Sequence, residues 1–194
     1  MKVSLDLKND SPSAWADAVM ADFPSFLMDH ANCERKASAM SMSLVAKYPD
    51  RHFIIKPLIE TAIEELEHFR DVVAWMDKLG VSLSQDMQPD PYVNQLIAQV
   101  RKGRDEGLID RLCLGSIIEC RGAERFRLVE ERMEEGELKR FYKILWASEA
   151  KHGNIFVELA LHYFPKDLVY KRLEELLEIE AKIIDTLEIR SALH

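Results

Sequence analysis

The sequence is poor in the residues that make turns and cross-links. Its 194 residues include only 7 Gly and 7 Pro, too few for the many tight turns of an all-β fold. The three cysteines are odd in number and form no C-x-x-C pair, which argues against a disulfide framework and against a zinc or iron–sulfur motif. We therefore interpret Cys33, Cys113 and Cys120 as small core residues of a reduced protein.

Long apolar runs are also missing. No run approaches the roughly 20 apolar residues that a membrane helix needs. Residues 1–8 lack the apolar segment of a signal peptide. Together with the cysteine usage, these absences predict a cytoplasmic protein with no membrane partner.

Basic residues are in deficit, with 26 Lys and Arg against 34 Asp and Glu and a formal net charge of −8. Taken alone, this balance argues against a general nucleic-acid binder. The deficit is uneven, because residues 101–143 hold 11 basic and 10 acidic side chains, whereas the remaining residues hold 15 and 24. An anionic partner is therefore expected to prefer residues 101–143.

Helix-forming residues are abundant. Long stretches rich in Ala, Leu, Glu, Lys, Arg and Met, punctuated by Pro and Gly, predict an all-α protein. The length fits a single domain over residues 1–194. The predicted helices cover about residues 12–21, 23–47, 51–79, 91–102, 106–135, 137–163 and 166–190.

The order of these helices predicts their topology. Short connections make antiparallel hairpins of the second and third helices and of the fifth and sixth. A crossover of about 25 residues joins the two hairpins, as in the ferritin-like form of a four-helix bundle. We expect this bundle, with accessory N-terminal, crossover and C-terminal helices.

Two of the long predicted helices carry the same polar interruption in an apolar stripe. Glu65 and His68 form one Glu-x-x-His pair, and Glu149 and His152 form the other. A carboxylate and an imidazole three residues apart lie on the same helix face. Each pair can therefore bind one metal ion.

The partner helix in each hairpin carries a single Glu on its predicted inward face. Glu34 precedes Glu65 by 31 residues, and Glu119 precedes Glu149 by 30. Because the chain turns near the midpoint of each interval, folding the hairpin brings the single Glu level with the Glu-x-x-His pair. The two hairpins are thus predicted to supply one half each of a two-metal site.

The chemistry of these residues favours metal over a network of structural ion pairs, which is the alternative. Unneutralised carboxylates on apolar faces would cost several kcal/mol each, and no Lys or Arg lies on those faces. Four carboxylates and two imidazoles without a thiolate suit iron or manganese. We predict a carboxylate-bridged centre of two iron ions, using O2 as co-substrate. Its catalytic and metal-binding residues are Glu34, Glu65, His68, Glu119, Glu149 and His152.

Three further polar residues have competing interpretations. Glu124 faces away from the predicted ligands and is expected to pair with Arg121 or Arg127. His30 lies one turn before the first ligand and could contact it or the substrate, although a satisfied core histidine is favoured. Tyr142 could be a redox tyrosine, but a core aromatic is favoured.

Four segments resemble the tRNA 2-methylthio-N6-isopentenyladenosine hydroxylases. They are residues 29–37 (DHANCERKA), 64–69 (EELEHF), 118–126 (IECRGAERF) and 148–152 (SEAKH). The resemblance runs from about residue 23 to about residue 163. It implies an O2-dependent di-iron monooxygenase that hydroxylates the isopentenyl group of a modified adenosine beside the tRNA anticodon. It also implies an external electron donor, a reductase or ferredoxin, and the same six metal ligands.

The pattern of residues lends this resemblance some support. Gly115 and Gly122 are small residues near the predicted metals and would leave room for a prenyl group. The candidates for contacts with tRNA phosphates are Arg101, Lys102, Arg104, Arg111, Arg125, Lys139, Arg140 and Lys143. Two other functions stay open: a ferritin-like or rubrerythrin-like iron oxidation, storage or peroxidase protein, and a scaffold bundle without metal chemistry.

Overall fold

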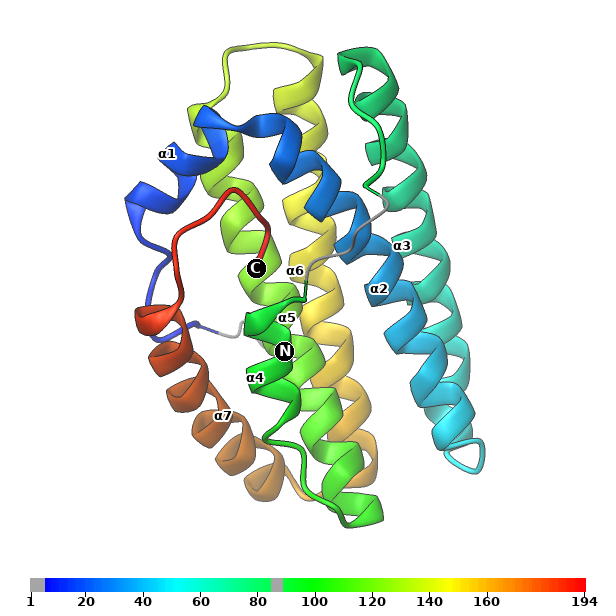
Figure 1. The fold of residues 1–194 in the computed structure, drawn as a ribbon. Helices are drawn as coiled ribbons and strands as arrows, with labels where there is room; N and C mark the ends of the chain where they lie inside the picture. The colour runs from blue at the N-terminus through cyan, green and yellow to red at the C-terminus, as the bar shows by residue number, and fades with distance from the viewer. Residues whose placement is uncertain (1–5, 85–88) are drawn as a thin grey trace. The chain divides into compact units, whose positions relative to one another are not determined.

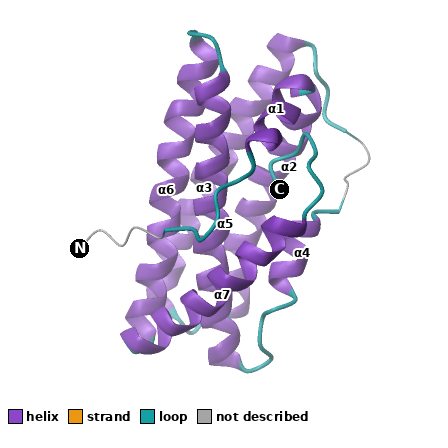
Figure 2. Ribbon diagram, turned by 90° about the vertical axis from the view of Figure 1, so that its left-hand side faces the viewer, coloured by secondary structure: helices purple, strands orange, loops and turns teal. Residues whose placement is uncertain are grey.

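The computed structural model describes residues 6–84 and 89–194. Within these ranges every regular element is an α-helix (Figure 1, Figure 2). The helices are α1 (Ser13–Ala21), α2 (Phe23–Lys47), α3 (His52–Leu79), α4 (Pro91–Ile97), α5 (Arg104–Arg132), α6 (Glu137–Tyr163) and α7 (Lys166–Thr186). The predicted all-α class and the predicted order of helices are confirmed. In the described part of the chain, no helix has the length and mean hydropathy of a membrane span.

The crossover helix α4 is shorter than predicted, because it ends at Ile97 rather than near residue 102. The backbone that follows bonds to distant side chains instead of continuing the helix. The Arg101 amide donates to Asp110 Oδ2 (2.8 Å), and the Gln99 carbonyl accepts from Arg172 Nη2 (3.0 Å). Of the predicted crossover between the two hairpins, residues 85–88 lie outside the described residues.

The chain divides into two compact units, which we describe separately. Of the described residues, the first comprises 15–84 and 190–193, and its main element is the α2–α3 hairpin. The Asp22 side chain caps α2 by accepting from the Ser25 amide (3.3 Å), and α3 ends at Gly80, whose φ of +69° is the left-handed conformation that glycine favours. That the whole chain is a single domain stays a prediction.

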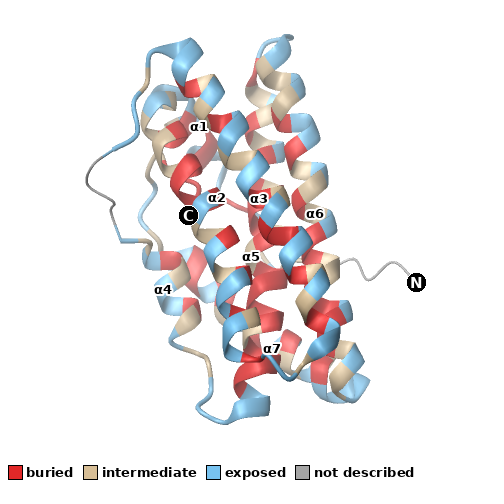
Figure 3. Cartoon of the chain, turned by 90° about the vertical axis from the view of Figure 1, so that its right-hand side faces the viewer, coloured by how far each residue is buried: buried red, intermediate tan, exposed pale blue. Residues whose placement is uncertain are grey.

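Of the described residues, the second unit comprises 6–14, 89–189 and 194, and its main element is the α5–α6 hairpin, with α4 and α7 packed against it. Figure 3 shows α5 as a largely buried helix. Two points bring α5 and α6 close together. A Cβ atom added to Gly115 would lie 3.0 Å from the Phe156 ring, and the Ser116 hydroxyl donates to the Gly153 carbonyl (2.7 Å).

A buried polar network fastens α5 to its neighbours in this unit. Arg121, whose side chain is fully buried, donates from Nε to Glu180 Oε1 on α7 (2.8 Å) and from Nη2 to the Asn9 carbonyl (2.7 Å). The Tyr92 hydroxyl of α4 donates to the same Glu180 oxygen (3.1 Å). One carboxylate therefore holds together three helices.

Asp110 is a second buried carboxylate in this unit, and two guanidinium groups hold it. Arg101 Nη2 and Arg172 Nε each lie 2.7 Å from Oδ1. Burial raises the pKa of Asp110, but the hydrogen bonds from both arginines outweigh it, so the pKa lies below its ordinary value of 3.8. A carboxyl group with a depressed pKa stabilises the fold above its unfolded pKa, and this contribution is lost as the pH falls through the folded value.

We expect Asp110→Asn to lower the free energy of unfolding at pH 7 by about 2 kcal/mol. The difference from the wild type should shrink as the pH falls below the ordinary pKa of 3.8, because the unfolded wild-type chain then binds a proton that the folded state binds only at lower pH. Urea denaturation at pH 7 and at pH 3 measures both values. The exposed Asp77→Asn serves as a control with little effect at either pH. A deficit that did not change with pH would contradict this account.

Candidate metal centre

The α2–α3 hairpin brings three of the predicted ligands together. Glu34 on α2 and Glu65 on α3 are 3% and 1% exposed. His68 Nδ1 lies 3.3 Å from Glu65 Oε2 and 3.6 Å from Glu34 Oε2. One potential ligand atom from each of the three residues lies within 4.8 Å of the other two. We call Glu34, Glu65 and His68 the α2–α3 triad.

The register of the hairpin is fixed close to this triad. The Ser38 hydroxyl, one turn after Glu34, donates to the carbonyl of Ala62 (2.8 Å), three residues before Glu65. Small side chains at Ser38 and Ala62 let the two helices approach at this level. The predicted alignment of the single Glu with the Glu-x-x-His pair is therefore confirmed in this hairpin.

His30 contacts the triad directly. Its side chain is fully buried, and Nε2 lies 2.7 Å from Glu34 Oε1. The ring packs on Phe26, with 5.7 Å between centroids, so its orientation is fixed. The sequence favoured a satisfied core histidine at this position. The structure shows that the satisfying group is the predicted ligand Glu34, and the spacing of four residues on one buried helix face is the signal that could have revealed it.

We expect His30→Leu to weaken iron binding by about 10- to 100-fold, because a buried group that orients a metal ligand typically has an effect of this size. His30→Gln, which keeps a polar group within reach of Glu34, should recover part of the loss. Titration of the metal-free protein with Fe(II) under anaerobic conditions measures the affinity. Wild-type affinity in both variants would mean that His30 serves packing alone.

The α5–α6 hairpin forms a matching α5–α6 triad of Glu119, Glu149 and His152. All three are buried, with exposed fractions of 5%, 3% and 0%. His152 Nδ1 lies 3.4 Å from Glu149 Oε2, and one potential ligand atom from each residue lies within 4.8 Å of the others. The bond from Ser116 to the residue after His152 sets this register. Both predicted half-sites are thus assembled within their own hairpins.

The donor chemistry of each triad fits a divalent metal. Two buried carboxylates close enough to share a cation repel each other when both are ionised. A cation between them removes that repulsion, and the imidazole adds a nitrogen ligand. Carboxylate and imidazole without thiolate suit iron. Thiolate ligation is also disfavoured for Cys113 and Cys120, because burial raises the pKa of each thiol to about 12.

Glu124 and Tyr142, which were not predicted to be ligands, have the roles favoured for them by the sequence. Glu124 accepts from Arg121 Nη1 (3.1 Å) and from the Ser11 hydroxyl (2.7 Å), so the predicted pairing with Arg121 is confirmed. Tyr142 is fully buried and packs its ring against Phe126, with centroids 5.7 Å apart, as expected of a core aromatic.

Gly115 and Gly122, both predicted to leave space beside the metals, differ in the space that the structure gives them. Gly115 leaves no room, because the Phe156 ring occupies the position of a side chain there. Its smallness serves helix packing, and the prediction for this residue is wrong. Gly122 is buried, yet no heavy atom of the described residues beyond its own helix backbone and chain neighbours lies within 4 Å of a Cβ atom added to it. Gly122 therefore provides space.

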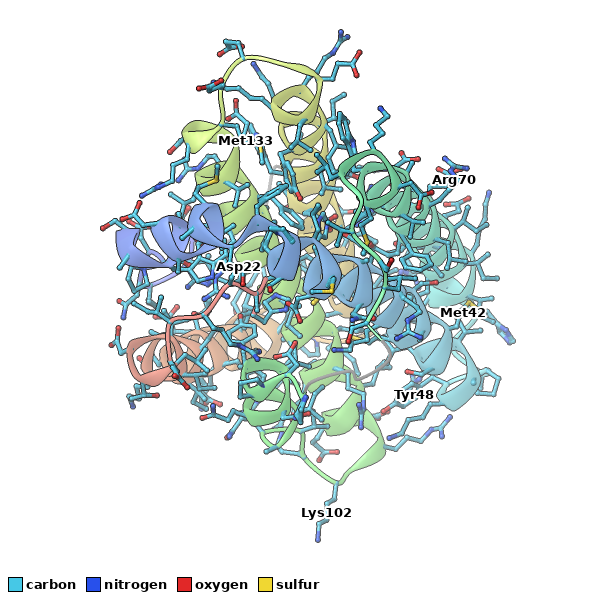
Figure 4. All side chains as sticks on the ribbon, turned by 45° about the horizontal axis from the view of Figure 1, so that its top comes forward. Asp22, Met42, Tyr48, Arg70, Lys102 and Met133 are labelled. Atoms are coloured by element: carbon cyan, nitrogen blue, oxygen red, sulfur yellow. The ribbon has the colours of Figure 1, made fainter. Side chains whose placement is uncertain are left out.

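One of the predicted phosphate contacts is wrong, because Arg125 is 4% exposed and donates to the Ser11 hydroxyl (3.1 Å). Arg101 binds the buried Asp110, but 42% of its side chain is exposed, so its contact with phosphate stays a prediction. Lys102, in contrast, projects from the turn before α5 (Figure 4), and Arg140 and Lys143 on α6 are exposed.

Comparisons with known proteins agree with this geometry. The model of the family described as tRNA-(MS2IO6A)-hydroxylase (MiaE) matches residues 2–194. The chain is 38% identical over 153 residues to a tRNA 2-(methylsulfanyl)-N(6)-isopentenyladenosine(37) hydroxylase of Pseudomonas putida, covering 79% of this chain and 74% of that protein. A protein of the same name from Salmonella typhimurium is 26% identical, covering 90% and 82%.

A solved structure is similar over nearly the whole chain. It is described as protein 43 with aldehyde deformylating oxygenase activity, from Synechococcus. It matches with a TM-score of 0.91 and 31% identity, covering 97% of this chain and 94% of that one. The predicted ferritin-like class of helical bundle is confirmed by this likeness.

Proposed function

Because the chain belongs to the tRNA-(MS2IO6A)-hydroxylase family, we propose that it hydroxylates the isopentenyl group of a 2-methylthio-N6-isopentenyladenosine beside the tRNA anticodon. The observation that carries the proposal is the pair of Glu, Glu and His triads, one in each hairpin, in which every side chain except the partly exposed His68 is buried. The hydroxylase family and a set of ligand residues suited to iron both point to iron-dependent hydroxylation.

We propose that the six triad residues would hold two iron ions. Each triad would supply two carboxylates and one imidazole. Bound iron would supply the redox chemistry that activates O2 with electrons from an external donor. One oxygen atom enters a C–H bond of the prenyl group, and the other leaves as water with two electrons and two protons.

The protein's own residues prepare this chemistry. His30 holds Glu34 in one orientation through the 2.7 Å contact. The apolar side chains of the buried helix faces exclude water from the ligands, which strengthens every electrostatic interaction among them. The free space at Gly122, three residues after Glu119, is available to an apolar group of the substrate.

The outward face of α6 is suited to the phosphates of tRNA. Arg140, Lys143 and Lys151 are exposed along one side of this helix, together with Ile144, which is 64% exposed. Between residues 138 and 157 the only acidic side chain is the buried Glu149. The same helix therefore offers cations to solvent and ligands to the metal, and we propose that it contacts the anticodon arm.

Substitution of these exposed cations should weaken tRNA binding. We expect Arg140→Ala, Lys143→Ala and Lys151→Ala each to raise the KM for tRNA severalfold and to reduce the slope of log affinity against log salt by about one. Iron content should not change. Lys182→Ala, an exposed lysine on α7, is the matched control. If a variant that combines all three substitutions kept the wild-type salt slope, this surface would be ruled out as the site of tRNA binding.

The decisive test of function uses purified iron-loaded protein, prenylated tRNA, O2 and a chemical reductant. Mass spectrometry of digested tRNA should show one added oxygen atom on the prenylated nucleoside, and labelled O2 should supply it. An aldehyde substrate tests a second candidate, favoured by the likeness to the Synechococcus protein. Formate release without nucleoside oxidation would select that activity, and iron mineralisation in a large assembly would select the storage alternative.

A further inference from the structure

The outward face of α3 carries an exposed apolar stripe. Ile59, Ile63 and Leu66 are 37%, 53% and 50% exposed, and their spacing of four and then three residues places them on one side of the helix. Partly exposed apolar residues extend the stripe, namely Ile55, Phe69 and Val73. Scattered apolar residues are common on surfaces, but a continuous row of large ones marks an interaction site.

Charges beside the stripe restrict its partner. Glu60, Glu67 and Asp71 are exposed and follow one flank of the stripe by helical spacing. The basic residues at its two ends are paired, with Lys56 Nζ 3.7 Å from Glu60 and Arg70 Nε 3.3 Å from Asp71. Glu60, Glu67 and Asp71 outnumber Lys56 and Arg70 by one, so the surface is apolar with a weakly acidic flank. RNA would be repelled, and a protein with an apolar centre and a basic rim would be attracted.

A second copy of this chain fits the stripe poorly. A symmetric antiparallel pairing of two α3 helices about Ile63 would bring the acidic flank of one copy against that of the other, with Glu60 nearly level with Glu67 of the second copy. Like charges in contact across an interface disfavour association. The partner is therefore a different protein.

The stripe lies close to the metal ligands. Glu65 and His68 belong to the same turns of α3 as Ile63 and Leu66 but point to the opposite side of the helix. One helix diameter, about 10 Å, separates the two sides. A redox group held against the stripe would thus reach the α2–α3 triad across a single helix, along a route through covalent and hydrogen-bonded atoms.

We propose that the stripe of Ile59, Ile63 and Leu66 docks the electron-donor protein, through an apolar surface rimmed by Lys and Arg. The inference rests on the proposed hydroxylase function. The donor delivers two electrons for each hydroxylation, so that O2 and two protons yield the hydroxyl group and water. The acidic flank at Glu60 and Glu67 orients the donor as it approaches.

Two assays separate docking from catalysis. Cells that lack the gene are complemented with wild-type protein or with the Ile63→Ser, Leu66→Ser double variant at equal abundance, and hydroxylated tRNA nucleoside is quantified early after induction. In this assay the cell's own donor protein supplies the electrons. The purified proteins are also assayed with a chemical reductant and mediator. The double variant should be about tenfold slower in cells and unchanged with the chemical reductant, with full iron content.

Controls keep the outcome decisive. Leu168→Ser removes an equally exposed leucine from α7 and should behave as wild type in both assays. A variant with both Glu60→Lys and Glu67→Lys should be slower in cells and unchanged with the chemical reductant. Three outcomes would overturn the docking proposal. The double variant could hydroxylate at the wild-type rate in cells, or it could lose activity in both assays. The wild-type protein could also form a dimer that the double variant does not form. Failure of wild-type protein to hydroxylate in either assay would instead remove the proposed function.

Discussion

Alanine at Glu65 or Glu149 is expected to abolish most iron binding and hydroxylation. Each residue is buried and pairs with the histidine three residues later, at 3.3 Å in one triad and 3.4 Å in the other. Iron content should fall from about two ions per chain to less than one. Activity should fall by more than about 100-fold, because even groups that only orient ligands reach that size of effect. Metal analysis and single-turnover assays measure both.

A matched pair of variants on α5 tests which face of this helix points toward the metals. Glu119→Gln should lose at least one iron, whereas Glu124→Gln should keep both, because Glu124 is engaged by Ser11 and Arg121. The two substitutions are chemically identical and five residues apart on the same helix. The reverse result would show that α5 presents a different face to the metals.

Glu180→Leu is expected to cause the largest loss of stability of any single substitution considered. It removes the carboxylate that Arg121 and Tyr92 share, and it leaves a guanidinium buried without its main counter-charge. Breaking such a pair typically costs about 3 to 5 kcal/mol. In a domain of this size the midpoint of thermal unfolding should fall by roughly 10 °C. Thermal and urea denaturation measure the change.

The double variant Arg121→Met, Glu180→Leu isolates the cause. Because it removes both charges and fills the space with apolar atoms, it should recover much of the lost stability. Iron content in this variant should stay near the wild-type value, since neither side chain belongs to a triad. If the double variant were as unstable as Glu180→Leu, the loss would come from packing rather than from the unpaired charge.

The helices and both triads could be predicted because their causes are local. Apolar spacing marks the buried face of each helix, and Pro24, Gly80 and Gly136 mark ends of elements. Glu-x-x-His needs only helical geometry to bring its two groups together. The partner Glu follows from hairpin length. The structure agrees with these steps because each depends only on helix geometry or on the length of a single hairpin.

The errors concern residues whose partners are distant. The sequence could not show that Arg125 is buried, because the residue that binds it, Ser11, precedes it by 114 positions. The role of Arg101 in holding Asp110 could not be predicted for a similar reason, since Arg172 of α7 completes the site around that carboxylate. For His30 the partner is only four residues away, but the direction of its ring depends on packing against Phe26.

The close approach of α6 to α5 at Gly153 makes the two halves of the protein non-interchangeable. A Cβ atom at this position would lie 2.6 Å from Cys120 Sγ and 3.3 Å from the Ser116 carbonyl oxygen. The equivalent residue after His68 is Phe69. An engineer who grafted the ligand-bearing turn of α3, including Phe69, onto α6 beside the natural α5 would place an aromatic ring where there is no space for a methyl group. In distant sequences, a glycine directly after the second Glu-x-x-His should therefore distinguish the α6 half from the α3 half.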